Sequence, residues 1–209
     1  MSDLGVRTAT SLLLIALTLV AAVLGGTVFA VLVAAVATVM FYEWTRLVRG
    51  WGAAWYVGGF FYALLPALAL LYVREPVRGL EVLVWVFIVT WATDIGGYFV
   101  GRAVGRTPLA PTISPKKTVE GLVGGIAAAT LLGGLWVFLN GLGGALYLAA
   151  PLFALWAQLG DLFESAMKRR AGVKDSGSFL PGHGGVLDRL DGLVPVALFT
   201  AIMQMAGLT

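Results

Sequence analysis

The sequence predicts an all-α, polytopic integral membrane protein with about seven transmembrane helices and a cytoplasmic N-terminus. The 209 residues are 59% hydrophobic and only 12% charged, about half the charged fraction of a typical soluble domain. Continuous apolar runs of about 20 residues, the length that crosses a bilayer, recur along the chain and favour helices over a lipid-facing β-barrel. The absence of cysteine excludes a disulfide framework, a thiolate metal site and a cysteine nucleophile. We expect a single domain over residues 1–209.

Three apolar runs, at residues 8–24, 27–44 and 54–73, predict the first three spans. Arg7 before the first run would also suit a signal peptide. However, the apolar part exceeds the usual ~7–15 residues, and no clear small-x-small cleavage site follows, so we expect an uncleaved span. Glu43 stands near the end of the second run, where we expect it to mark the membrane interface.

Four further apolar runs, at residues 81–100, 119–139, 145–168 and 186–208, predict the remaining spans. A charged turn with Pro76 precedes them, since proline ends a helix and charges favour water. The run at 119–139 is rich in glycine and alanine, small residues that let membrane helices approach closely. Two long polar loops, at 101–118 and 171–185, separate the later spans.

Lysine and arginine are distributed unequally between the two ends of the expected spans. Of the 14 basic residues, only Arg74 and Arg78 fall on the side opposite the N-terminus, and the other twelve share its side. Basic loops stay in the cytoplasm. We therefore expect the N-terminus inside, the C-terminus outside, and both long polar loops facing the cytoplasm.

Four polar residues of the sixth run, Asp161, Glu164, Ser165 and Lys168, are spaced at i, i+3, i+4 and i+7 and share one helix face. Asp161 lies about 10 Å, or two turns, below the basic end of this helix. A carboxylate at that depth is costly in lipid and faces a cavity or a partner. A structural ion pair between helices is the alternative to a functional site.

Asp94 and Asp188, near the cytoplasmic ends of two other expected spans, lie at depths compatible with Asp161. Carboxylates at one level, beside a pool of lysine and arginine, suit a hard divalent cation. Mg²⁺ typically takes one or two protein carboxylates and completes its shell with water and substrate phosphates. We therefore expect Asp161 and Asp188 to bind Mg²⁺, with Asp94 as a further candidate.

The loop at 179–185 contains three glycines and the only histidine, His183. Glycine permits close backbone approach, and successive amides can form an anion-binding nest, although a plain turn is the alternative. The position of the loop between the Lys174-Asp175 pair and Asp188 favours a phosphate ligand. His183 has no second histidine for a metal site, and phosphate binding, proton donation and a bracing role all stay open for it.

A second polar motif covers residues 114–121. Ser114 or Thr118 can cap the helix that begins at residue 119. Lys116 and Lys117 stand near the positive end of that helix, where cations are disfavoured unless an anion is present. An incoming triphosphate would account for these lysines, and so would the general preference for lysine at cytoplasmic helix ends.

The later part of the chain combines these motifs in one long pattern, which contains Ser165, Lys168-Arg169, Lys174-Asp175, His183-Gly184-Gly185 and Asp188-Arg189-Leu190-Asp191. It resembles the signature of the phosphatidate cytidylyltransferases, also called CDP-diacylglycerol synthases, and the motif-bearing part is about residues 90–209. The resemblance implies the reaction of CTP with phosphatidate to give CDP-diacylglycerol and pyrophosphate. It further implies dependence on Mg²⁺, in some members with a second ion such as K⁺, a homodimer, and a metal centre held by Asp161 and Asp188.

The residue patterns and the resemblance together give the candidate site. The candidate catalytic residues are Asp161, Asp188, Lys174, Arg189 and His183. Residues expected to bind substrate phosphate are Ser114, Lys116, Lys117, Thr118, Ser165, Lys168, Arg169, Asp175, Gly184 and Gly185. We expect an enzyme of the cytoplasmic (inner) membrane that acts on a membrane lipid at its cytoplasmic face and has no nucleic-acid partner. The alternatives are a CTP-dependent transferase for another membrane lipid phosphate and an ion-coupled transporter, although the nearly uncharged outer loops disfavour a transporter.

Overall fold

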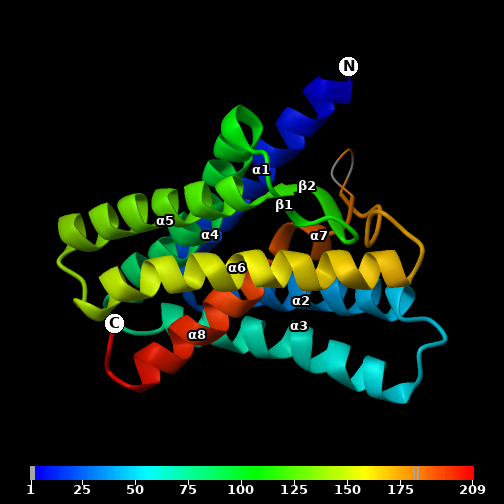
Figure 1. Ribbon diagram of the computed structural model, residues 1–209. Helices are drawn as coiled ribbons and strands as arrows, with labels where there is room; N and C mark the ends of the chain where they lie inside the picture. The colour runs from blue at the N-terminus through cyan, green and yellow to red at the C-terminus, as the bar shows by residue number, and fades with distance from the viewer. Residues whose placement is uncertain (1–2, 181, 183) are drawn as a thin grey trace.

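The computed structural model describes residues 3–180, 182 and 184–209 (Figure 1). In this part of the chain helices and strands follow in the order α1 Asp3–Leu24, α2 Gly26–Leu47, α3 Ala53–Arg74, α4 Gly79–Val104, β1 Pro108–Ala110, β2 Ser114–Thr118, α5 Val119–Asn140, α6 Ala145–Arg170, α7 Leu187–Leu190 and α8 Leu193–Met205.

The helices α2 to α6 are each long and apolar enough to cross a membrane by length and composition. This confirms the prediction of a helical membrane protein. The apolar part of α1, Thr8–Leu24, and the whole of α8 are shorter. The number of seven spans and the orientation of the N-terminus therefore stay predictions.

The prediction of one continuous helix over residues 186–208 is wrong. The chain forms α7, of only four residues, and then α8, of 13 residues. Pro195, in the first turn of α8, has no N–H group, and its ring would clash with the carbonyl of Asp191 in an unbroken helix. At about 1.5 Å per residue, α8 is about 20 Å long, which is shorter than the ~30 Å hydrocarbon core of a bilayer.

The polar loop that we expected at 101–118 contains regular structure. Helix α4 continues to Val104, and β1 and β2 pair as an antiparallel hairpin. The chain stays mainly helical, in agreement with the all-α prediction, and this small two-stranded sheet is its one addition in the described residues. Figure 1 shows this hairpin, the loop before α7 and α7 itself gathered on one side of the helical bundle.

Glycines bring α4 and α5 into close contact. A Cβ atom built at Gly96 would lie 2.5 Å from Cβ of Ala128, and one at Gly125 would lie 2.6 Å from the carbonyl oxygen of Thr93. These distances are shorter than real Cβ contacts, so small residues are required where the two helices meet, as the sequence predicted. A buried apolar core joins α4 and α5 to α6 and α8, and this packing fixes the helix that carries Asp161.

Candidate active site

One face of α6 presents Asp161, Glu164, Ser165 and Lys168 together, as their spacing predicts. Glu164 and Ser165 are buried, and Oγ of Ser165 donates a hydrogen bond of 3.2 Å to Oδ1 of Asp161. Nζ of Lys168 lies 3.0 Å from Oε2 of Glu164 and 2.7 Å from Oδ1 of Asp188. Lys168 therefore joins α6 to α7.

Asp188, in α7, is held by main-chain amides as well as by Lys168. The N–H of Ser176 donates to its two carboxylate oxygens at 3.1 and 2.9 Å, and the N–H of Gly185 donates to Oδ2 at 2.8 Å. Burial alone would raise the pKa of Asp188, but the hydrogen bonds from Lys168 and the Gly185 amide hold this pKa below its ordinary value. Gly184 has a φ of +84°, a conformation that favours glycine. The Gly185 amide thus meets a carboxylate here, and the phosphate role of the two glycines stays a prediction.

The β1–β2 hairpin, which contains Lys116 and Lys117, contacts α6. Lys117 in β2 forms an ion pair with Asp161. Nε of Arg169 donates a hydrogen bond of 3.1 Å to the carbonyl oxygen of Ile113, which ties the hairpin to the end of α6. The hydroxyl of Thr118 accepts a backbone hydrogen bond from the first turn of α5, so the predicted cap is confirmed for Thr118.

Glu43 of α2 binds the segment that precedes α7, although the sequence led us to place it at the membrane interface. It is buried and accepts hydrogen bonds from the N–H groups of Val186 at 3.1 Å and Leu187 at 2.8 Å, and from the hydroxyl of Ser176 at 3.3 Å. A Cβ at Gly185 would lie 2.6 Å from Oε2 of Glu43. The signal available in the sequence was the one used for Asp161, a carboxylate inside an apolar run.

Two further aspartates belong to the same electrostatic cluster. Asp94 of α4 interacts with the charges of Asp161 and Lys117. Asp191, between α7 and α8, interacts with those of Asp161 and Glu164, and its Oδ1 accepts a hydrogen bond of 2.7 Å from the next main-chain amide. Asp191 had no role in our sequence-based site, although it closes the long motif.

The predicted Mg²⁺ site at Asp161 and Asp188 stays a prediction. Among the residues that the structure describes, no three Asp, Glu, His or Cys side chains are grouped so that they could hold an ion by themselves. Oε1 of Glu164 is buried and makes no hydrogen bond within the described chain. Mg²⁺ needs only one or two carboxylates when water and phosphate oxygens complete its shell. An ion at Asp161 and Asp188 would therefore need further oxygen ligands from outside the chain, because Lys117 and Lys168 pair with these carboxylates in the structure.

The remaining candidate residues have fewer described contacts with the acidic cluster. Ser114 is half-buried in β2, and Arg189 of α7 interacts with the charge of Asp94. His183 lies outside the described residues, so its three possible roles stay open. Exposed candidates are Lys116, Lys174 and Asp175.

Comparison with known proteins shows which family the chain is similar to. Residues 48–206 match the model of the cytidylyltransferase family. A phosphatidate cytidylyltransferase of Brucella suis biovar 1 is 39% identical over an alignment 266 positions long, which covers 99% of this chain and 94% of that protein. Proteins of the same name from Haemophilus influenzae and Bacillus subtilis are 43% and 46% identical over 61% and 58% of this chain, and over 47% and 46% of their own lengths.

Proposed function

Because the chain belongs to the cytidylyltransferase family, we propose that it transfers the cytidylyl group of CTP to phosphatidate. The products are CDP-diacylglycerol, for phospholipid synthesis, and pyrophosphate. The structural observation that carries this proposal is the pairing of Asp161 with Lys117 and of Asp188 with Lys168. Carboxylates can hold a metal ion, and lysines can bind the phosphates that the metal neutralises. One site thus offers both kinds of charge that a triphosphate substrate requires.

The transfer is a substitution at the α-phosphorus of CTP. A phosphate oxygen of phosphatidate forms the new P–O bond, while the bond from the α-phosphorus to the oxygen that bridges to the β-phosphorus breaks. Pyrophosphate leaves with that electron pair. The attacking oxygen already carries negative charge, so no strong general base is needed, and catalysis consists of positioning and charge neutralisation. Mg²⁺ bound by Asp161 and Asp188 would supply part of that neutralisation.

The residues of the chain provide the rest of the positioning. We propose that Lys117 and Lys168 exchange their carboxylate partners for phosphate oxygens when CTP binds, since both side chains already reach the acids that would hold the metal. Lys174 and Arg189 supply further positive charge. Ser165 orients Asp161 through its hydrogen bond.

Glu43 is proposed as a positioning residue. It touches none of the expected reacting groups, but it binds the amides of Val186 and Leu187, immediately before Asp188. Its third bond, from Ser176, fixes the residue whose main-chain amide also binds Asp188. Glu43 therefore acts on Asp188 through two routes, the backbone of Val186 and Leu187 and the residue Ser176, while Lys168 reaches the carboxylate separately from α6.

The membrane arrangement follows from the charge distribution. We propose about seven spans, a cytoplasmic N-terminus and a site at the inner face, where the lipid headgroup reaches the acids while its tails stay in the bilayer. A homodimer and a second ion such as K⁺ are proposed from the family resemblance.

The test is purified protein with CTP, phosphatidate and Mg²⁺, in which pyrophosphate release and transfer of label from α-phosphate-labelled CTP to lipid are measured together. The two products should appear in equal amounts, and a chelator should stop both. Polyprenyl phosphate is assayed in parallel. Label transfer to polyprenyl phosphate but not to phosphatidate would overturn the substrate assignment, and no pyrophosphate release with either lipid would refute the transferase.

A further inference from the structure

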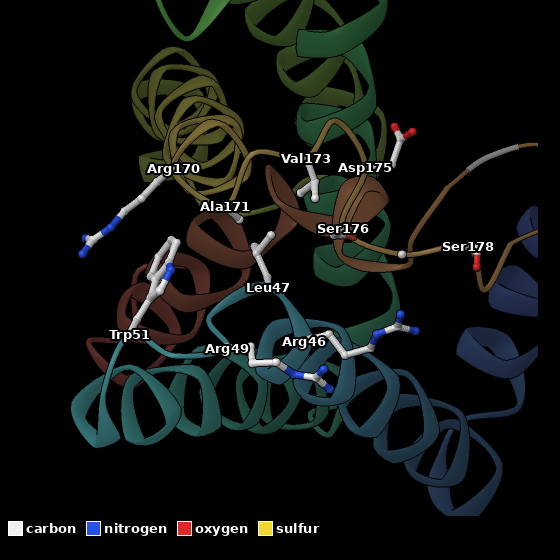
Figure 2. A pocket seen from close by; sticks show the side chains of 11 residues that line it. Arg46, Leu47, Arg49, Trp51, Arg170, Ala171, Val173, Asp175, Ser176 and Ser178 are labelled. Atoms are coloured by element: carbon white, nitrogen blue, oxygen red, sulfur yellow. The ribbon is translucent and has the colours of Figure 1, made fainter.

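A polar cavity of ≈ 420 Å³ lies between the C-terminal ends of α2 and α6 and the loop segment 175–178 (Figure 2). Its size is within the range of ~300–1,000 Å³ found for small-ligand sites. Ser176 separates it from the acidic cluster, since its main-chain N–H binds Asp188 and its hydroxyl binds Glu43. The cavity is therefore on the other side of the loop from the site described above.

The walls of the cavity carry an excess of positive charge. Arg46, Arg49 and Arg170 line it, against a single carboxylate, Asp175. Figure 2 shows the side chain of Asp175 directed away from Arg46 and Arg49. Within the described chain, none of these three guanidinium groups forms an ion pair with a carboxylate, whereas Lys168 is paired with two. The protein therefore leaves this charge available to an external anion.

Two tryptophans indicate the depth of the cavity relative to the membrane surface. The guanidinium carbon of Arg170 lies 4.3 Å from the ring centroid of Trp51 and 5.1 Å from that of Trp55. Stacking against two indole rings holds the guanidinium in one place. Tryptophan is enriched where membrane helices meet the lipid headgroups, and both rings stand where α2 passes into α3. The anion nearest to these arginines in a membrane is thus a lipid phosphate.

We propose that this cavity binds the phosphate headgroup of an acidic membrane phospholipid, at a site separate from the catalytic cluster. Arginine forks bind two phosphate oxygens at once, which suits a headgroup held by Arg46 and Arg49, whose guanidinium groups lie near each other in Figure 2. The guanidinium of Arg170 lies on the far side of Trp51. The volume accommodates a phosphate with a small polar substituent, such as glycerol. This binding does not depend on the proposed transferase function, and its test uses no turnover.

The test is lipid retention by the full-length protein in detergent micelles, titrated with phosphatidylglycerol or with phosphatidylcholine and followed by native mass spectrometry. R46Q/R49Q removes two charges from the cavity. R102Q/R106Q removes two charges from elsewhere on the expected cytoplasmic side and serves as the matched control. One arginine beside an anionic surface contributes about fivefold in affinity. We therefore expect R46Q/R49Q to weaken phosphatidylglycerol retention at least about tenfold, and the control to change it by less than about twofold.

Three outcomes would refute the proposed lipid-binding site. Equal losses in both double variants would mean general attraction of a basic surface. Equal retention of phosphatidylcholine and phosphatidylglycerol by the native protein would exclude charge recognition. Displacement of phosphatidylglycerol by millimolar inorganic phosphate or by CTP would identify a soluble anion as the ligand. If R46Q/R49Q does not fold, the single variant R49Q provides the same comparison, with R102Q as its control.

Discussion

Replacing Glu43 by glutamine tests whether a buried carboxylate on α2 sets the position of Asp188 in α7. The change keeps the volume of the side chain and removes one acceptor oxygen and the charge. In the native protein, Oε1 accepts from Val186, and Oε2 accepts from Leu187 and Ser176. A glutamine in this place must direct its NH₂ group at one of these donors, so at least one N–H or O–H loses its acceptor.

The size of the effect follows from these bonds. A hydrogen bond to a charged group contributes about 1.5–3 kcal/mol, and an unsatisfied buried donor costs a similar amount. We expect E43Q to lose about 2–4 kcal/mol of local stability in the loop before α7. A displacement of about 1 Å at a catalytic group costs about 100-fold in rate. The kcat should therefore fall about 100-fold, whereas KM for CTP should change much less.

The assay is pyrophosphate release at saturating CTP and phosphatidate, with thermal unfolding of each variant measured in the same detergent. The stability control is L146A. Leu146 is fully buried near the start of α6, far along the helix from the site, and its truncation costs about 2–5 kcal/mol. L146A should keep kcat per folded molecule, and E43D, which retains both oxygens and the charge, should keep more activity than E43Q. The positioning role is refuted if E43Q retains kcat within about twofold, or if E43Q and L146A lose activity only in proportion to unfolding.

Three further changes test the site. D188N removes the charge expected to bind the metal, so turnover should fall at least about 1,000-fold in a protein that still folds; near-normal turnover would exclude the ligand role. G185A places a methyl group 2.6 Å from Oε2 of Glu43, so kcat should fall about 100-fold. The control G58A, whose added methyl meets nothing within 4 Å, should leave kcat unchanged. Equal kcat in the two variants would contradict this packing. K117M should raise KM for CTP at least about tenfold. The increase should exceed that of K116M, because of these two lysines only Lys117 reaches Asp161. A larger increase in K116M than in K117M would place the triphosphate elsewhere.

Some features did not emerge from the sequence because hydrophobic run length and residue periodicity do not encode them. Run length placed residues 186–208 in one helix although Pro195 stands in that run. The structure ends α7 at Leu190 and begins α8 at Leu193, with Pro195 in the first turn of α8. The hairpin was missed because its strands have only three and five residues, without the apolar alternation that predicts a strand.

The sequence by itself determined the helical membrane class, the shared face of Asp161, Glu164, Ser165 and Lys168, and the cap at Thr118. These depend on hydrophobic run length, on the helical repeat and on hydrogen bonds within one turn, all of which are local. The family also follows from residue spacing, because its long motif is continuous in the chain.

Only the tertiary structure decided which charges meet. Lys117 reaches Asp161 across 44 positions, and Glu43 reaches Leu187 across 144. Such partners are chosen by how helices pack, and packing depends on glycines such as Gly96 and Gly125 fitting against another helix. The sequence shows that each buried charge needs a partner, and the fold selects that partner because burial leaves it only the groups that packing brings within reach.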